Sequence, residues 1–231
     1  MLDIHLLDNP IWSSLTTAHS SFATGSGLAR AYLQEIGPLS GLAEESSAAY
    51  EDLRAQANPS AVQVLFLDQP QVPKSGWSLI RGGQLTQMVY AGRGIEESAE
   101  PSGMRVLTPA DVPAMVELAT LTEPGPFRHR THELGVFFGI FEEGDRLLAM
   151  AGQRMRVAGF VEVSAVCTHP DARGRGYART LMSSVMKLIL REGDTPFLHS
   201  FADNHSAIRV YNALGFTHRR AFHLEVLKRD S

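Results

Sequence analysis

The residues from Val161 to Ala178, VEVSAVCTHPDARGRGYA, are the part of the chain whose types and spacing most clearly suggest chemistry. An apolar segment of β type leads into the turn Arg173-Gly174-Arg175-Gly176, and a helical pattern follows at once. Backbone N–H groups in such a turn point into one concavity, and the positive end of the helix dipole lies behind them. Glycine suits this turn because a Cβ would block both the left-handed dihedrals and the close approach of a ligand. The pattern therefore predicts a binding site for a phosphate group.

Two common phosphate-binding motifs are excluded by the residues that follow Gly176. A P-loop requires Lys and then Ser or Thr after its last glycine, but Tyr177-Ala178 stands there. A dinucleotide fingerprint requires Gly or Ala three residues after Gly176, where the chain has Arg179. The pattern that remains is Arg173-x-x-Gly176-x-Ala178. Its structural alternative is a plain glycine-rich turn that binds nothing.

Periodicity predicts the elements that must position this turn. A strand at Phe160–Thr168 precedes it, and the helix after it carries an apolar stripe of Tyr177, Leu181, Val185, Leu188 and Ile189 that ends at Gly193. The other elements predicted after residue 103 are a strand at 104–107, a helix from 109 to about 121, two strands within 134–157 around the turn 143–145, a strand at 196–202, a helix at 206–214 and a strand at 216–226. Asn204 is the expected N-cap of the helix at 206–214.

A polar segment at 92–103, GRGIEESAEPSG, lacks periodicity and predicts a joint between two parts of the chain. Before it, the pattern predicts a helix at 11–22, a strand at 28–33, a helix at 43–57 and strands at 61–67 and 77–90. We expect the last strand to be interrupted at Gly82-Gly83. This first part carries no recognisable chemical motif.

Composition restricts the class of protein. With 44% hydrophobic and 20% charged residues, the chain of 231 residues resembles an ordinary globular protein. No apolar run approaches the ~20 residues that span a bilayer, so no membrane partner is expected. The segment MLDIHLLDNP lacks the basic and apolar regions of a signal peptide. The single cysteine, Cys167, excludes an internal disulfide framework and fits a reducing compartment, so we expect a cytoplasmic location.

Charge is distributed unevenly along the chain, whose net charge is −4. Residues 1–103 carry 5 Lys and Arg against 11 Asp and Glu, whereas residues 104–231 carry 16 against 14. The mildly basic second part suits a polyanionic cofactor. Neither part has the basic density or the interleaved aromatic residues of a nucleic-acid-binding protein, so no nucleic-acid partner is expected.

Two separate motifs make the second part similar to a known superfamily. Arg173-x-x-Gly176-x-Ala178 resembles the coenzyme A pyrophosphate loop of the GNAT N-acyltransferases, whose pattern is Gln/Arg-x-x-Gly-x-Gly/Ala. Asn204-x-x-Ala207-x-x-x-Tyr211-x-x-Leu214-Gly215-Phe216 resembles a second segment of that superfamily, in the right order and at the right distance. The resemblance covers about residues 104–228. It implies an α/β (α+β) protein with the GNAT fold, whose mixed, mostly antiparallel central sheet is flanked by helices.

Shorter phrases at 159–169 (GFVEVSAVCTH), 197–200 (FLHS) and 87–89 (QMV) look closest to a subgroup related to glycine N-acyltransferase. Members of that subgroup carry a second, degenerate copy of the fold at the N-terminus. The order strand–helix–strand–strand predicted for residues 28–90 is compatible with such a copy. The resemblance therefore implies a degenerate GNAT-like half at 1–95 and an acyl-CoA-binding catalytic domain at 104–231.

The resemblance also implies a cofactor site, with acetyl-CoA as the co-substrate. Its pyrophosphate would lie on the backbone of Arg173, Gly174, Arg175, Gly176, Tyr177 and Ala178. The arginine side chains could add charge-assisted contacts, or could be solvated loop charges. The strand around Val166, Cys167 and Thr168 would bulge, so that its main chain binds the pantetheine amides and the N–H of Val166 polarises the thioester carbonyl. The alternative is an ordinary buried strand. Asn204 and Ala207 complete the cofactor-binding set.

Two side chains are candidates for moving protons. The matched motif places Tyr211 where relatives use a tyrosine to protonate the leaving thiolate, although periodicity alone would make it part of the core. We nominate Glu162 as a general base acting through water, because a free aliphatic amine titrates near ~10 and needs assistance at neutral pH. Glu162 could equally be a structural acceptor for backbone or arginine.

Other reactive residue types carry less weight. His129-x-x-His132 has helical spacing but no partner cysteine or acidic cluster, so no metal is expected. His199 could line the acceptor site, although a hydrogen-bonded core histidine fits its strand as well. The sequence shows neither a base nor a lowered pKa for Cys167, so direct transfer in a ternary complex is favoured over an acyl-cysteine.

The function predicted from sequence is acetyl transfer to a primary amine, with a small-molecule amine as the expected acceptor and a homodimer as a possible assembly. Two alternatives remain open. One is a non-catalytic acyl-CoA sensor. The other makes residues 1–95 an interaction module that recruits a protein substrate.

Overall fold

The computed structural model describes residues 3–70, 74–92, 94–95, 100–142 and 145–230. A sheet of eight strands, in the order β4-β11-β5-β10-β9-β8-β7-β6, runs through the molecule, and a second sheet has the order β1-β2-β3. In the large sheet β10 and β9 pair in parallel, and the other neighbours pair antiparallel. The mixed, mostly antiparallel sheet predicted from the sequence is therefore confirmed. No helix within the described ranges has both the length and the apolar character needed to cross a membrane.

The strands are β1 (Ala23–Thr24), β2 (Ala29–Tyr32), β3 (Ser40–Leu42), β4 (Val62–Leu67), β5 (Trp77–Tyr90), β6 (Met104–Val106), β7 (Phe137–Glu142), β8 (Arg146–Val157), β9 (Phe160–Thr168), β10 (Thr195–Phe201) and β11 (Phe216–Arg229). The α-helices are α1 (Pro10–Thr16), α2 (Ser47–Gln56), α3 (Val112–Thr122), α4 (Tyr177–Arg191) and α5 (His205–Ala213). Short 3-10 helices lie at Ile4–Asp8, Ser20–Phe22, Pro109–Asp111, Thr131–Leu134 and Pro170–Ala172.

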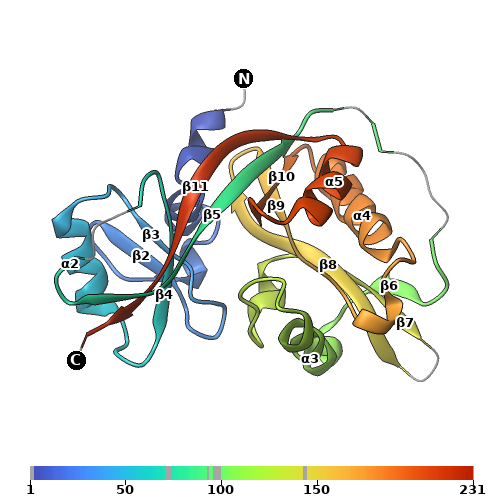
Figure 1. Ribbon diagram of the computed structural model, residues 1–231, viewed down its shortest axis with the longest axis horizontal. Helices are drawn as coiled ribbons and strands as arrows, with labels where there is room; N and C mark the ends of the chain where they lie inside the picture. Colours follow the sequence, from blue (N-terminus) through green and yellow to red (C-terminus); the bar gives the residue numbers. More distant parts are fainter. Residues whose placement is uncertain (1–2, 71–73, 93, 96–99, 143–144, 231) are drawn as a thin grey trace.

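The large sheet is continuous across the joint expected at 92–103, of which residues 93 and 96–99 lie outside the described ranges. The strand β5 comes before the joint, yet it lies between β10 and β11, which both come after it. Figure 1 shows β5 and β11 as long strands that cross the molecule from the side with α4 and α5 to the side with α2 and β4. Residues from both parts of the chain therefore build one sheet.

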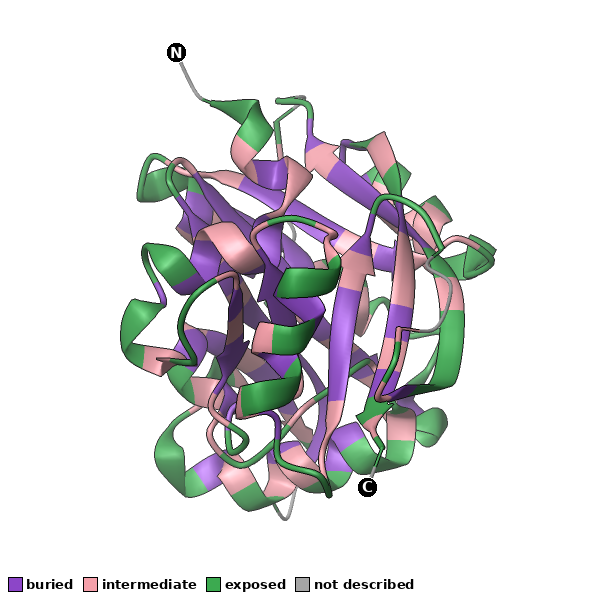
Figure 2. Cartoon of the chain, turned by 90° about the vertical axis from the view of Figure 1, so that its left-hand side faces the viewer, coloured by how far each residue is buried: buried purple, intermediate pink, exposed green. Residues whose placement is uncertain are grey.

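Helices cover both faces of the sheet at β8 and β9, so alternate residues of these strands face different cores. Ala149 and Ala151 pack with the apolar stripe of α4, in which Leu181, Val185 and Ile189 are fully buried. Met150, between the two alanines, packs with α3 instead. Figure 2 shows buried residues along the central strands and exposed residues on the outer faces of the helices. Burial on both faces explains why β8 shows an apolar run instead of a strict alternation.

Two helices predicted in the first part of the chain have other bounds in the structure. The helix predicted at 11–22 ends at Thr16, because Thr16 and Thr17 turn their hydroxyls to the carbonyls of Trp12 and Ser13 and compete with the backbone ladder. The helix predicted from residue 43 begins at Ser47, since Ser46 caps it by accepting from the N–H of Ala49. The residues just before it include the strand β3, which the sequence did not indicate.

The interruption predicted at Gly82-Gly83 is also absent, and β5 runs through both glycines. They pair with Glu225 and Leu224 of β11 in regular register. A Cβ at Gly83 would lie 3.0 Å from the Phe201 ring, so the glycine allows a close approach of that ring to the strand.

Candidate active site

The turn between β9 and α4 has the left-handed glycines that the sequence analysis expects there. Gly174 and Gly176 both have φ of +78°, and no atom lies within 4 Å of the position that a Cβ would occupy at either residue. Gly176 is the N-cap of α4, which begins at Tyr177. The first N–H groups of a helix have no acceptor within the helix, so they point from this end toward open space. The loop geometry predicted from the sequence is present.

Hydrogen bonds from Arg146 and Arg175 hold Asp171, which comes just before this loop. Arg146 donates to Asp171 Oδ2 at 3.0 Å and also contacts the His169 ring. Arg175 donates to the carbonyl of Asp171 at 3.2 Å, whereas the exposed Arg173 reaches into solvent. The loop is therefore held from one side, and its glycine side stays open.

A bulge in β9 lies just before the loop. Ala165 has φ of +51°, which is uncommon for a residue with a side chain. The register against β8 shifts at this point, from Met150 opposite Cys167 to Gly152 opposite Ser164. The bulge implied by the family resemblance is confirmed, and it re-aims the strand around Val166.

The strands β9 and β10 pair through three residue pairs and then separate. Their parallel pairs are Thr195 with Phe160, Pro196 with Val161 and Phe197 with Glu162. From Phe197 onward β10 pairs with β5 on its other side. The backbone of β9 after Glu162 therefore lies beside a wedge-shaped opening in the sheet.

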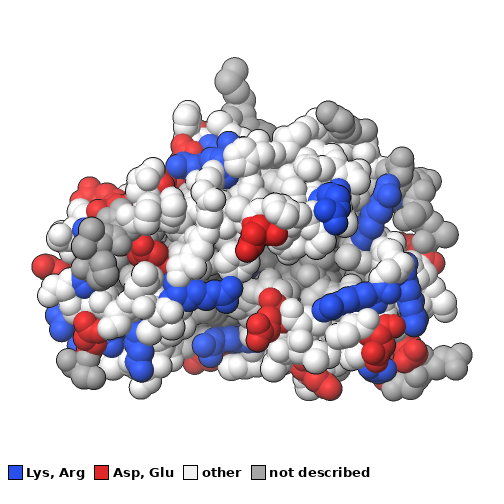
Figure 3. Space-filling model, viewed as in Figure 1, with Lys and Arg blue, Asp and Glu red and all other residues white. Residues whose placement is uncertain are grey.

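A cavity of about 630 Å³ fills this opening. Val166 lines it from β9, Ser200 from β10, and Asn204 and Tyr211 from the segment that contains α5. The loop at 123–126, between α3 and β7, lines another side. Figure 3 shows a hollow near the middle of this face of the molecule, with basic and acidic side chains around it. The structure thus brings Val166, Asn204 and Tyr211 to one cavity.

Tyr211 is a partly buried residue of that cavity. Burial raises the pKa of its hydroxyl, and a hydrogen bond with the Ser200 side chain opposes the rise. The ring also packs edge-on against Phe216, with centroids 6.4 Å apart. The phenol therefore stays protonated through neutral pH, as an acid must before it donates its proton.

Glu162 is fully buried and bound by an arginine. Arg154 donates to it bidentately, from Nε to Oε2 and from Nη2 to Oε1, both at 2.7 Å. Burial alone would raise the pKa of Glu162, but the charge and hydrogen bonds of Arg154 lower it to about 2. A carboxylate with so low a pKa, with no exposed surface, is a poor proton acceptor. The geometry favours the structural alternative, an acceptor for arginine, over the general base that we nominated.

His199 belongs to the same buried network, and its tautomer follows from its neighbours. Gln87 accepts from Arg219 through Oε1 at 2.8 Å and donates to the carbonyl of Leu7 through Nε2 at 2.9 Å, which fixes the orientation of the amide. Its Nε2 therefore donates to His199 Nε2 at 3.0 Å, so that the ring donates from Nδ1 to Glu162 at 2.7 Å. Burial lowers the pKa of His199, which is consistent with a neutral ring. His199 is a hydrogen-bonded residue of the core and of the cavity lining.

Cys167 points away from the cavity. Its side chain packs with Met115, Leu118 and Met150 under α3. Burial raises the pKa of the thiol to about 11, so it carries little thiolate at neutral pH. This environment agrees with the preference for direct transfer over an acyl-cysteine.

Asn204 and Ala207 meet at the start of α5. The Asn204 Oδ1 accepts from the N–H of Ala207 at 3.2 Å and from the Ser206 hydroxyl at 3.0 Å. The predicted N-cap is confirmed. The cap orients α5, and thereby the Tyr211 side chain one turn beyond Ala207.

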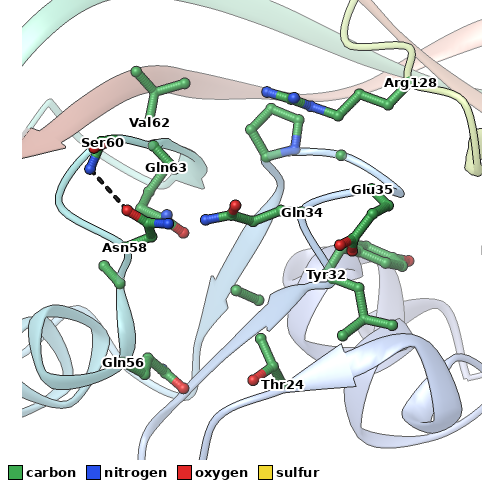
Figure 4. Close-up of a pocket in the computed structure, with 16 residues that line it drawn as sticks. Thr24, Tyr32, Gln34, Glu35, Gln56, Asn58, Ser60, Val62, Gln63 and Arg128 are labelled. Carbon is green, nitrogen blue, oxygen red and sulfur yellow. Dashed lines mark hydrogen bonds between the residues drawn. The ribbon is translucent and has the colours of Figure 1, made fainter.

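A second cavity, of about 460 Å³, lies near β2 and the start of β4. Amide and hydroxyl side chains such as Gln34, Gln56, Asn58 and Ser60 line much of it, and the N–H of Ser60 donates to Asn58 Oδ1 at 2.9 Å (Figure 4). None of the site residues predicted from the sequence lines this cavity. The cavity at Tyr211 is therefore the candidate active site.

No group of three or more His, Cys, Asp or Glu side chains within the described ranges is arranged to hold a metal ion. The Nδ1 of His132 donates to the neighbouring carbonyl of His129, at 2.9 Å.

Sequence reasoning missed Arg154 and Gln87 as residues of the site. Arg154 stands in the middle of the buried strand β8, next to the fully buried Met155. The available signal was a charged residue directly before the apolar Met155 in a strand of mostly apolar residues, because a charge on a buried strand needs a partner. Its partner, Glu162, is reached only through the pairing of β8 with β9.

Comparison with known proteins adds the family. The model of the FR47-like protein family matches residues 137–224. The chain is also similar to a protein of known crystal structure from Novosphingobium aromaticivorans, which is described as an acetyltransferase of the GNAT family by prediction. The two sequences are 38% identical, the alignment covers 98% of this chain and 100% of that chain, and the TM-score is 0.89. None of the curated proteins compared has a significant match to the sequence.

More distant structures share the fold. A GCN5-related N-acetyltransferase from Kribbella flavida is 16% identical, with 97% of this chain and 96% of that chain covered and a TM-score of 0.65. A GCN5-related N-acetyltransferase-like protein from Streptococcus suis is 13% identical, with coverages of 95% and 92% and a TM-score of 0.58. Both alignments include the first part of the chain, so that part belongs to a shared architecture.

Proposed function

Because this chain belongs to the GNAT acetyltransferase family, we propose that it transfers an acetyl group from acetyl-CoA to a primary amine by direct attack in a ternary complex. The observation that carries the proposal is one cavity that joins the bulged strand at Val166 to the protonated hydroxyl of Tyr211. The acceptor we propose is a small-molecule amine. Four further statements stay predictions from the sequence: the relation to glycine N-acyltransferase, the degenerate GNAT-like copy at 1–95, the homodimer and the cytoplasmic location.

The residues present fit acetyl-CoA. The open glycine side of residues 173–178 and the start of α4 offer backbone N–H groups to a pyrophosphate, and Arg173 or Arg175 can add charge. A pantetheine arm that ran from that loop into the cavity would pass along β9, where the main chain of Val166, Cys167 and Thr168 would bind its amides. When bound, acetyl-CoA supplies the activated acetyl group as a thioester.

Two groups of the chain would act on the reacting atoms. The N–H of Val166 would donate to the developing oxyanion, and a well-placed donor of this kind is worth ~3 kcal/mol in the transition state. As the amine nitrogen bonds to the carbonyl carbon and the carbon–sulfur bond breaks, the hydroxyl of Tyr211 would donate its proton to the sulfur. The proton that the amine nitrogen loses would pass to water, and through water it would restore the phenol of Tyr211. Glu162 would hold Arg154 and would not accept a proton from the amine.

The proposal is tested by binding and turnover measured on the same preparation. We expect acetyl-CoA to bind and a panel of primary amines to release free CoA thiol, with the acetylated amine identified by mass spectrometry. Binding without thiol release from any amine would favour the alternative of an acyl-CoA sensor. Deletion of 1–95 is not a useful test of the interaction-module alternative, because β4 and β5 are strands of the large sheet.

Substitution of Gly176 tests the cofactor loop. We expect Gly176→Ala to raise the Kd for acetyl-CoA about tenfold, since a left-handed backbone disfavours a side chain by ~1–2 kcal/mol and the new methyl group points toward the open side of the loop. Isothermal titration calorimetry measures the change. Gly193 is a matched control, because it has φ of +86°, has equally open surroundings and follows the opposite end of α4. Gly193→Ala should lower stability without changing the Kd, and an equal effect of both variants on the Kd would contradict the loop assignment.

A further inference from the structure

The cavity at Tyr211 has one extended apolar wall. Six side chains from β4, β5, β11 and the segment before β3 form it, namely Leu39, Val64, Phe66, Leu85, Leu224 and Val226. All of them come from the first part of the chain or from the last strand. A ligand that fills this cavity therefore presents an apolar body to these strands.

Arg154 is a charged group in the lining of the same cavity, and 11% of its side chain is exposed. Its Nε and Nη2 each donate to Glu162, whereas Nη1 has no hydrogen-bond partner among the described residues. A guanidinium carries five N–H groups, so three of them remain available. Arg154 and the apolar wall line the same cavity.

A buried hydrogen-bond network around Glu162 fixes the position of Arg154. Glu162 accepts both from Arg154 and from His199, and His199 is held by Gln87, which Arg219 and the carbonyl of Leu7 orient in turn. Arg154 therefore cannot swing to another partner without breaking a buried network. Its unused N–H groups need an acceptor from the ligand or from water, and an ionised oxygen acceptor forms the stronger bond.

We propose that Arg154 binds a carboxylate carried by the acceptor, so that the acceptor is an amine bearing both a carboxylate and an apolar body. This inference rests on the proposed function, because it names the substrate class of the same site. Arg81 and Glu123 also line the cavity, but both are exposed residues at its edge, and Arg81 lies over the Phe201 ring at 5.1 Å. Arg154 is the cation on the buried side.

Matched acceptors test the inference on the unaltered protein. We would compare apolar amino acids, such as leucine, each with its amide and with the amine that lacks the carboxyl group. We expect kcat/KM to be about 10- to 100-fold higher for the carboxylate form, because loss of a charge-assisted bond leaves the arginine unpaired. Equal or higher kcat/KM for the amides and simple amines would overturn the inference while leaving the proposed function intact.

A matched pair of variants assigns the preference to one residue. Arg154→Lys should reduce the ratio of carboxylate to amide turnover at least fivefold, since an ammonium lacks the planar fork. Arg81→Gln removes another arginine of the lining and should leave that ratio unchanged. A ratio that falls with Arg81→Gln and not with Arg154→Lys would overturn the assignment.

A binding measurement keeps the inference testable where Arg154→Lys fails to fold or no amine is acetylated. The unaltered protein, saturated with CoA, should be thermally stabilised by 4-methylpentanoate and not by 4-methylpentanamide. Equal stabilisation by both compounds, or by neither, would overturn the inference. Failure of the proposed function would appear separately, as binding of the acid without thiol release from any amine.

Discussion

Tyr211→Phe should lower kcat about 100-fold or more while leaving the affinity for acetyl-CoA nearly unchanged. The ring and its contact with Phe216 stay in place, so the variant removes only the hydroxyl at the cavity. General acid catalysis is typically worth 10²–10⁴-fold, and the leaving thiolate loses its proton donor. Steady-state kinetics with a CoA-thiol assay measures kcat, and calorimetry measures the affinity.

Tyr90→Phe is the matched control for this substitution. Tyr90 is a buried tyrosine that also packs edge-on against Phe216, with centroids 6.1 Å apart, but it does not line the cavity. Its loss of a hydroxyl should leave kcat within about twofold. Unchanged turnover in Tyr211→Phe, or an equal loss in both variants, would show that Tyr211 is not the acid.

Arg154→Met should lower the free energy of unfolding by about 3–5 kcal/mol, because it leaves a buried carboxylate without its cation. Glu162 has no exposed surface and would keep only His199 Nδ1, at 2.7 Å, and the more distant N–H of Met155, at 3.4 Å. Urea denaturation monitored by circular dichroism measures the change. The double variant Arg154→Met/Glu162→Leu should recover most of the loss, since both charges are then removed.

Arg130→Met provides the control, because the Arg130–Glu133 pair has a similar hydrogen-bond geometry but is more exposed than the Arg154–Glu162 pair. Arg130 also donates bidentately to a carboxylate, that of Glu133, at 2.7 and 2.8 Å. Both side chains are about one-third exposed, so water screens the pair and its loss should cost less than about 1 kcal/mol. A loss in Arg154→Met no larger than in this control would show that the buried pair contributes little to stability.

The contribution of the Arg154–Glu162 pair to the free energy of unfolding should decrease at acidic pH. Arg154 lowers the pKa of Glu162 from 4.5 to about 2, so the pair contributes its full stability above about pH 4.5. That contribution is lost as the pH falls from 4.5 through 2, because the folded state must then bind a proton. The difference in unfolding free energy between the unaltered protein and Arg154→Met should therefore narrow over that range. A difference that stays constant down to pH 2 would contradict the assignment.

The parts of the site that could be predicted from sequence are those formed by neighbours in the chain. The loop at 173–178 and the start of α4 are adjacent in sequence, and the left-handed backbone at Gly174 and Gly176 requires glycine locally. The cap between Asn204 and Ala207 spans three residues. Tyr211 follows one turn later on the same helix. Short-range dihedral and hydrogen-bond rules act on such segments, so their residue types are informative by themselves.

The sequence by itself determined the glycine turn before α4, the order of most elements and the place of Tyr211 on the helix that Asn204 caps. Only the tertiary structure decided that β5 lies between β10 and β11, because strand order depends on pairing between distant segments. It also decided the role of Glu162, since burial and the pairing of β8 with β9 bring Arg154 to both of its oxygens. The contact of Gln87 with His199 joins residues 112 positions apart. Such contacts arise from register and packing across the sheet, which local residue patterns do not encode.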